Sequence, residues 1–512
     1  MSQFIHFVFH EKNNRRLIIL AVIATVAQFI IFKLLYPYPD FFSDSYSYIF
    51  AASAKLEVNI WPIGYSKFLG LFHQLTHSDT ALVAFQYFFL ELAALYFFFS
   101  IKYFYNPGKI TGYILFIFLF FNPLFLYIGN YINSDGLFAA LSLLWLTELI
   151  WIINCTRPYQ LLTQSVLLFL SFTVRHNAMY YPFIAMIVFV LSKQKLSMKL
   201  VGISLGLVIV CLFVVHERNS SYELYGAKQF SPMSGWQLAN NALYMRGNIE
   251  VDTSRLANAE VRELDKISTK FFDHVPADFN EFLAFYVANF FIRQPQAPLK
   301  TYFDKHFNPK DEKEMVIAWG KVSVVFDEYG SWLIRHYPIE YLRYFLLVNA
   351  KNYFFPPLEK LEVYNLGENQ VSVIGQDWFD YKTPYVTSIS KDAQSYVLFI
   401  FPSIFLFINL LFLGSIVWAS FRKGIRIRDF ISDPLIILAA SLYLANSLFS
   451  IGSSMIVLRY QFFPIIACLA FTLLILEWMD KKIKETAALG AQISAGKTNM
   501  EQLRVQPITP NH

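Results

Sequence analysis

Long apolar runs separated by shorter polar segments form the dominant pattern of this chain. About ten runs approach or reach the ~20 residues that a membrane-crossing helix needs. We predict spans at 17–36, 80–104, 110–128, 135–155, 160–176, 178–192, 199–215, 395–421, 434–450 and 455–477. The first run is too long for a removable signal peptide and lacks a small-residue cleavage site, so we interpret it as an uncleaved anchor. The pattern predicts an all-α integral membrane protein with about ten transmembrane helices.

Two segments outside the predicted spans are long. In 37–79, apolar residues such as Ile49 and Leu69 lie on helical stripes, which predicts helices lying in the membrane interface. The other segment is punctuated by prolines, and we predict a mostly helical insertion with runs near 254–273, 278–292, 312–336 and 338–352. We therefore divide the chain into an N-terminal membrane module (1–215), an extracytoplasmic domain (216–394), C-terminal membrane helices (395–484) and a polar tail (485–512) that we expect to be disordered.

The composition agrees with a membrane protein and excludes several other classes. Hydrophobic residues make up 56% of the 512 residues and charged residues only 15%, against roughly a quarter charged in a soluble domain. This excludes a disordered chain and an ordinary cytosolic enzyme. The net charge of +5 comes with no dense basic stretch, so nucleic acid is not an expected partner. The three cysteines indicate neither a disulfide nor a zinc site.

Basic residues in short loops fall on one side of the predicted spans, which favours a cytoplasmic N-terminus. The inner loops then hold Lys12, Arg15, Arg16, Lys102, Lys109, Arg157, Lys193, Lys195, Lys199, Arg422, Lys423, Arg426, Arg428, Lys481, Lys482 and Lys484. The short outer segments hold only Lys55, Lys67 and Arg175. We expect a multi-pass protein of the inner (plasma) membrane with both termini cytoplasmic and the segments 37–79 and 216–394 outside.

Several familiar catalytic motifs are missing. The chain contains no P-loop, and both HE pairs lack the second histidine of a zinc protease motif. The segment Gly202–Gly206 matches GxSxG, but it lies inside a predicted membrane helix, where two glycines four residues apart favour close helix packing instead.

Ionisable residues from several sequence-distant places fall at the outer ends of the predicted spans. They are Asp40, Asp44, Asp135, Arg175 with His176, and Arg459. Such groups are costly at membrane depth and are functional candidates by default. Their common level predicts a catalytic cavity at the outer interface.

Each of these residues also has an ordinary structural interpretation. Asp44 suits the first turn of a helix, as N-cap or through the helix dipole. Asp40, which follows Pro39, is more often a turn residue. Arg175 suits a structural pair with Asp135, and Arg459 suits an interface position beside Tyr460.

Two further candidates carry the same ambiguity. His176 is more often structural than catalytic. Lys67 suits the polar face of an interfacial helix.

Five fragments carry a family resemblance. Asp44 and Tyr48 follow the first span, and Trp61-Pro62-Ile63-Gly64-Tyr65 lies later in the same loop. The other three are Asn122-Pro123 before Asn133-Ser134-Asp135, Thr173-Val174-Arg175-His176-Asn177, and Leu458-Arg459-Tyr460 before Pro464. In their order and common side they resemble the GT-C superfamily of polyprenyl-phosphate-sugar-dependent glycosyltransferases, which includes protein mannosyltransferases and the lipid A aminoarabinose transferase. The chain departs from that pattern at Ser45, where a second acid is common, and 216–394 resembles nothing that we can name.

The resemblance implies an enzyme that takes a sugar from an isoprenoid phosphate in the outer leaflet. The acceptor would be a cell-envelope glycan, a lipid such as lipopolysaccharide, or a protein. Asp44 is then the general base, with Asp40, Asp135 and His176 as second-tier catalytic candidates. The donor phosphate is expected on Arg175, Arg459 and Lys67, with Tyr48 and Tyr460 as structural support. We predict no definite cofactor; a divalent metal ion stays open because some related enzymes use one, although Ser45 in place of an acid disfavours it.

Two other functions stay open. An O-antigen ligase or polymerase would depend on arginines and histidines of the outer domain, namely Arg293, His306, Arg335 and His336. A transporter would place charges near the bilayer midplane, where only Glu91 and Glu148 qualify. Asp44 discriminates between the enzymes, because a ligase does not need it.

Overall fold

The protein is a helical membrane protein with a helical domain at one end. The computed structural model describes residues 2–275, 287–421 and 427–504. No β-strand forms within these ranges; the helices leave only two isolated bridges, Asp40 with Tyr131 and Gln370 with Tyr385. The predicted all-α membrane class is confirmed.

Eight helical segments of the described chain are long and apolar enough to cross a membrane. They comprise α2 (Lys12–Leu35), α5 (Asp79–Tyr105), α6 with α7 (Lys109–Phe120 and Leu124–Asn130), α8 (Ser134–Cys155), α11 (Leu196–Tyr225), α21 with α22 (Ala393–Leu398 and Phe401–Phe421), α24 (Pro434–Ser453) and η6 with the first part of α25 (Leu458–Gln461 and Phe462–Arg504). The fifth and sixth predicted spans are shorter. They are α9 (Pro158–Val174), then η1 (His176–Tyr180) with α10 (Tyr181–Leu191).

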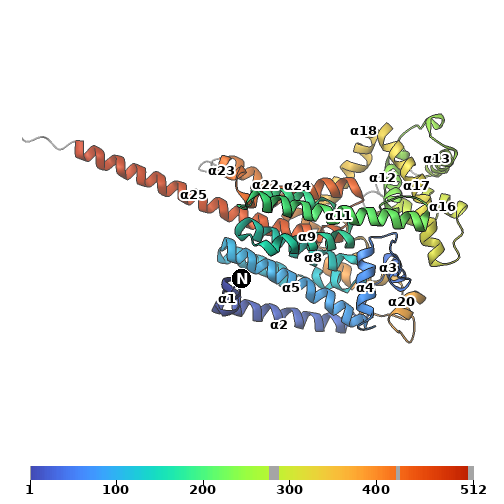
Figure 1. Ribbon diagram of the computed structural model, residues 1–512, viewed down its shortest axis with the longest axis horizontal. Helices are drawn as coiled ribbons and strands as arrows, with labels where there is room; N and C mark the ends of the chain where they lie inside the picture. Colours follow the sequence, from blue (N-terminus) through green and yellow to red (C-terminus); the bar gives the residue numbers. More distant parts are fainter. Residues whose placement is uncertain (1, 276–286, 422–426, 505–512) are drawn as a thin grey trace, which may run out of the picture.

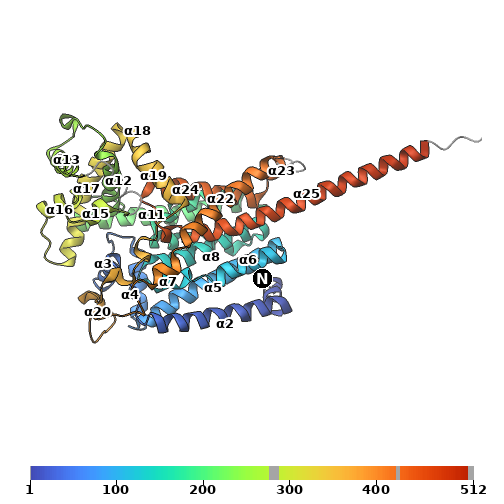
Figure 2. The same cartoon turned by 180° about the vertical axis from the view of Figure 1, so that it is seen from behind.

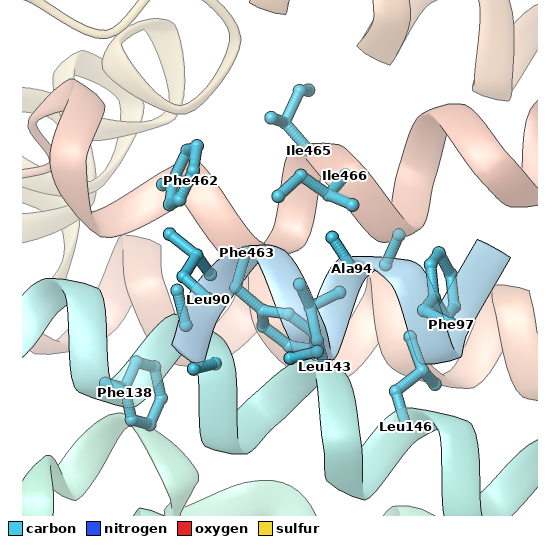
Figure 3. Packing of buried hydrophobic residues seen from close by; sticks show 14 of the residues in the cluster. Leu90, Ala94, Phe97, Phe138, Leu143, Leu146, Phe462, Phe463, Ile465 and Ile466 are labelled. Carbon is cyan, nitrogen blue, oxygen red and sulfur yellow. The ribbon is translucent and has the colours of Figure 1, made fainter. Parts of the chain in front are cut away.

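The core of the bundle forms where three of these helices meet. Figure 3 shows Leu90, Ala94 and Phe97 of α5 between side chains of α8 and of α25. The labelled partners are Phe138, Leu143, Leu146, Phe462, Phe463, Ile465 and Ile466, and all of them are buried. Because α25 is the last span and α5 among the first, this packing closes the bundle and brings the two halves of the chain together.

The domain formed by residues after α11 has a hydrophobic core of its own. That core includes Trp236 and Tyr244 of α12 (Pro232–Arg246) and Phe326 and Tyr329 of α17 (Glu312–His336). Its other helices are α13 (Ala259–Phe272), α15 (Phe290–Arg293), α16 (Pro298–His306), α18 (Pro338–Tyr341), η3 (Leu342–Leu346) and α19 (Leu347–Phe354). Short elements η2 (Thr253–Arg255), η4 (Glu359–Leu361), η5 (Tyr364–Gly367), α20 (Val373–Trp378) and α23 (Ile427–Ile431) complete the described helices.

The two ends of the bundle differ. Helices α12, α13, α16 and α17 gather at one end, beside α3 (Ser43–Ser53), α4 (Ile63–His73) and α20 (Figure 1). The short helix α1 (Ser2–His10) and the projecting part of α25 lie at the opposite end, and the reverse view shows the same separation (Figure 2). The two predicted helical runs in 37–79 are therefore α3 and α4, and they lie at the end that carries the domain.

Most predicted helices of the domain are present, with two differences. The run 278–292 falls largely outside the described residues. The tail, which we expected to be disordered, continues α25 as helix to Arg504. A buried span supplies the helical nucleus, so each further residue is added at little cost and the polar segment stays helical.

Candidate active site

Asp44 lies in the first turn of α3, the next helix after α2. The residue before the helix is Phe42, whose backbone N–H donates to Ser45 Oγ at 3.1 Å. Ser45 therefore satisfies an otherwise unpaired amide at the helix start. The Asp44 carboxylate is left for other contacts: Oδ2 accepts a hydrogen bond from Lys360 Nζ at 3.2 Å. The N-cap interpretation of Asp44 is wrong, although its place in the first turn still suits the helix dipole.

The second carboxylate, Asp135, joins two arginines. It lies in the first turn of α8 and is buried. One oxygen accepts from Arg175, the residue that ends α9, and the other accepts from Arg459 Nη1 at 3.0 Å. Arg459 lies in η6 with a side chain only 3% exposed, so it does not extend to the interface as the structural interpretation would have it. Three predicted residues are thus in direct contact.

Three further residues complete this cluster, and the sequence analysis did not group them as one site. Glu359 accepts from Arg293 with one oxygen and from Arg459 Nε, at 3.5 Å, with the other. Lys360, the next residue, pairs with Asp44. Arg293 was considered only for a ligase. In the sequence, Glu359 and Lys360 could have been noticed as a charged pair shortly after Pro356-Pro357. No apolar pattern around them indicated that they would be buried.

The Glu359–Lys360 segment is held from two sides. The backbone N–H of Leu458 donates to the carbonyl of Pro357 at 2.9 Å, and Tyr131 Oη donates to the carbonyl of Lys360 at 2.7 Å. Glu359 has φ +55°, a backbone conformation that is costly outside glycine. Because these contacts fix the turn, its two charged side chains point into the cluster.

Charge within the cluster is nearly balanced. Four cations (Arg175, Arg293, Lys360 and Arg459) face three carboxylates (Asp44, Asp135 and Glu359), which leaves one positive charge in excess. The surplus favours binding of an anion.

The cations also set the protonation states of the carboxylates. Burial alone would raise the pKa of Asp44, but the charges of Lys360, Arg459 and Arg293 outweigh burial and hold that pKa below its ordinary value. Burial is likewise overcome at Glu359, whose pKa falls to about 2 beside Arg293 and Arg459. Both carboxylates are therefore ionised at neutral pH.

Aromatic rings line the same charges. The Lys360 ammonium lies 4.0 Å from the centre of the Phe42 ring. The guanidinium carbons of Arg459 and Arg175 lie 4.5 and 4.8 Å from the centre of the Tyr460 ring. Such contacts stabilise cations that are removed from water. Tyr460 thereby holds both arginines, and Tyr48 holds the start of α8 through its hydroxyl, 3.2 Å from Ser134 Oγ.

Asp44 lies where two cavities meet. The inner cavity, about 400 Å³, is lined by Arg175, Arg459 and Tyr460 among others. The outer cavity, about 470 Å³, is lined by Arg293, Lys300 and Trp319 among others. Asp44, Trp61, Met233 and Asn289 line both. A group held in one cavity can therefore meet a group held in the other at the Asp44 carboxylate.

Three predicted site residues lie apart from the cluster. Asp40 is buried, and its Oδ1 accepts from the backbone N–H of Asn365 at 2.9 Å. Lys67 pairs with Glu57 at 2.7 Å, with a side chain 44% exposed, beside a separate apolar groove. His176 lines the inner cavity, but its Nε2 faces Glu217 Oε2 at 3.9 Å and not the arginine–carboxylate cluster.

Within the described residues, no group of three or more His, Cys, Asp or Glu side chains is arranged so that it could hold a metal ion. The carboxylates of the cluster are instead engaged by arginine and lysine.

Comparison with known proteins identifies no relative: no family model, no curated protein and no solved structure matches the chain.

Proposed function

We propose that the protein is a glycosyltransferase of the GT-C type, which moves a sugar from a polyprenyl-phosphate donor to an acceptor in the cell envelope. One observation carries this proposal: Asp44 stands at the junction between a cavity bearing two arginines and a second cavity that faces the outer domain. A transfer reaction needs such a junction, because donor and acceptor must approach one carbon atom from different sides.

In the proposed reaction, the residues of the cluster act on the acceptor and on the donor phosphate. The acceptor hydroxyl oxygen forms a bond to the anomeric carbon while the bond from that carbon to the phosphate oxygen breaks. The electron pair of the broken bond leaves on the lipid phosphate, and the hydroxyl proton passes to Asp44. Arg175 and Arg459 face the departing phosphate, whose oxygens match the planar fork of a guanidinium.

Asp135 has a supporting role in this scheme. It holds both guanidinium groups in place before any donor arrives. Groups that are oriented in advance need no rearrangement when charge develops on the leaving phosphate. Lys360 keeps Asp44 ionised and so ready to accept a proton.

The position of the cluster suits a lipid-linked donor. Asp135 begins the span α8 and Arg459 precedes α25, so the cluster lies at the ends of apolar helices. There an isoprenoid chain can remain among membrane helices while its phosphate reaches the arginines. With the basic loops in the cytoplasm, this end faces outward from the inner (plasma) membrane and both termini face inward.

The ligase alternative receives less support. Of the four outer basic residues that it would use, only Arg293 belongs to the cluster. His306 pairs with Glu263 at 3.2 Å, and His336 stacks on Trp332 with ring centres 4.0 Å apart.

The test compares wild type with Asp44→Asn in a strain that lacks the gene. Envelope glycolipids and glycoproteins are profiled by mass spectrometry. We expect a sugar-sized mass addition with wild type and its loss with Asp44→Asn, because the amide keeps the volume of the side chain and removes the base. Asp252→Asn is the matched control, since Asp252 is exposed and remote in the outer domain. Full product from a folded Asp44→Asn protein would refute the proposal.

A further inference from the structure

Most of the polar residues that line the inner cavity have neutral side chains. They are Asn133, Ser134, Asn177, Ser231, Ser234, Gln237, Asn289, Ser453 and Ser454. Its charged or titratable lining residues other than tyrosine are Asp44, Arg175, His176 and Arg459. Amides and hydroxyls both donate and accept hydrogen bonds, as sugar hydroxyls do.

Two of these residues form a connected amide pair. Gln237 Nε2 donates to Asn289 Oδ1 at 2.9 Å and to Asn241 Oδ1 at 2.8 Å. These bonds use the amide hydrogens of Gln237 and one acceptor of Asn289. Within the described residues, the opposite ends, Gln237 Oε1 and Asn289 Nδ2, have no hydrogen-bond partner. The pair thus keeps one acceptor and one donor for a molecule in the cavity.

The backbone fixes Asn289 in this position. Its φ is +57°, a left-handed conformation that asparagine tolerates better than most residues, and the residue is 5% exposed. Asn289 also lines both cavities, as Asp44 does. The free amide therefore lies at the junction where the reacting sugar must sit.

The one positive charge in excess within the cluster matches the single negative charge of the donor phosphodiester. The other charges that line the cavity are already paired, because Asp44 pairs with Lys360 and both Arg175 and Arg459 share Asp135. In the proposed reaction the arginines serve the phosphate. A sugar with an ammonium or a carboxylate group would thus bring a buried charge that finds no free partner, which is strongly unfavourable.

We propose that the transferred sugar is neutral, a hexose, deoxyhexose or N-acetylhexosamine, and that Gln237 and Asn289 bind its hydroxyl or amide groups. This rests on the proposed transferase function. A neutral substrate would exclude amino sugars with a free amine and uronic acids as the transferred sugar.

The first experiment identifies the transferred sugar by its mass. Glycolipid and glycoprotein fractions from the gene-deleted strain with wild type, and with Asp44→Asn, are analysed by mass spectrometry after mild acid hydrolysis. An Asp44-dependent neutral sugar is the expected result. An Asp44-dependent sugar with a free amine or carboxylate would overturn this inference and leave the transferase proposal standing. Absence of any Asp44-dependent sugar would overturn both.

The second experiment tests the amide pair with full-length variants. Gln237→Leu keeps much of the volume, and Asn289→Gly keeps the left-handed backbone while removing the amide. We expect each to lower transfer about tenfold at limiting donor, since each loses a hydrogen-bonding group to the sugar. Gln294→Leu, at an exposed glutamine in the same domain, should leave transfer unchanged. Wild-type transfer by both site variants would overturn the assignment of Gln237 and Asn289, and equal unfolding temperatures exclude a folding defect.

Discussion

Asp135 and Arg459 are 324 residues apart in sequence, yet Asp135 Oδ2 accepts a 3.0 Å hydrogen bond from Arg459 Nη1. The other carboxylate oxygen binds Arg175. One buried carboxylate therefore neutralises two arginines and joins the starts of α8 and α25 to the end of α9. This contact supports the fold and, in the proposed reaction, holds the two arginines that face the phosphate.

Replacement of Asp135 by asparagine leaves two guanidinium charges close together without their common counter-charge. Removal of one partner from a buried ion pair typically costs about 3 to 5 kcal/mol. We expect Asp135→Asn to unfold at a markedly lower temperature than wild type in detergent. Asp252→Asn should unfold as wild type does. An unchanged unfolding temperature for Asp135→Asn would show that the arginines find other partners.

Replacement of Lys360 by methionine should shift the pH dependence of transfer. Lys360 lowers the pKa of Asp44, so its removal raises that pKa and the acidic limb of the activity profile moves to higher pH. On the alkaline side, burial lowers the pKa of Lys360 to about 8 despite Asp44. Neutral Lys360 removes the positive charge in excess that favours the donor phosphate, so wild type should lose activity above about pH 8.

The control for that profile is Lys351→Met, at an exposed lysine of α19. It should keep both limbs of the wild-type profile. The Lys360→Met variant should lack the limb near pH 8. If the two variants gave the same profile, Lys360 would not govern Asp44.

Replacement of Asp40 by asparagine should stabilise the protein at high pH and leave transfer intact. Burial raises the pKa of Asp40 from 3.8 to about 7, against the hydrogen bond from Asn365. The folded protein therefore binds the proton more tightly than the unfolded chain, and wild-type stability falls as pH rises from about 4 to 7. Asp40→Asn should unfold at a higher temperature than wild type at pH 8 and at a similar one near pH 4. Loss of transfer in this variant would instead place Asp40 in the catalytic machinery.

Replacement of Gly64 by alanine should disturb the support of Arg175. A Cβ at Gly64 would lie 2.6 Å from the backbone carbonyl of Thr173, two residues before Arg175. Helix α4 and the end of α9 would have to separate, at a cost of about 1 to 3 kcal/mol. We expect a lower unfolding temperature and weaker transfer. Gly70→Ala on the same helix is the control, because its nearest neighbour would be 3.9 Å away.

The sequence predicted the membrane class because a membrane span needs a long apolar run. Such a run can be recognised in the sequence however the helices pack. The sequence also grouped Asp44, Asp135, Arg175 and Arg459, since each lies at the same end of an apolar helix. Helix ends on the same side of a bundle lie at one level, so the sequence could predict that these four residues lie near one another.

The other residues of the site are placed by tertiary packing, which the hydrophobic pattern of the sequence does not predict. Glu359 and Lys360 enter the cluster because a left-handed turn and two backbone contacts place them there. Lys67 is on α4, as predicted, but the helix directs it to Glu57 and a different groove. The neighbour of a side chain on an interfacial helix depends on how that helix is rotated, and the sequence left the rotation of α4 open.

Arg459 follows the other members of the cluster in sequence by about a hundred residues or more. A chain is synthesised from its N-terminus, so Asp44, Asp135 and Arg175 reach the membrane early and Lys360 later. Until the last span inserts, Asp135 has only one of its two arginines, and the cluster lacks the cation that also contacts Glu359. Assembly of the site thus coincides with completed biogenesis. Under the proposed function, a chain whose synthesis stops before residue 459 lacks one of the two arginines that face the donor phosphate, so it would not consume lipid-linked sugar.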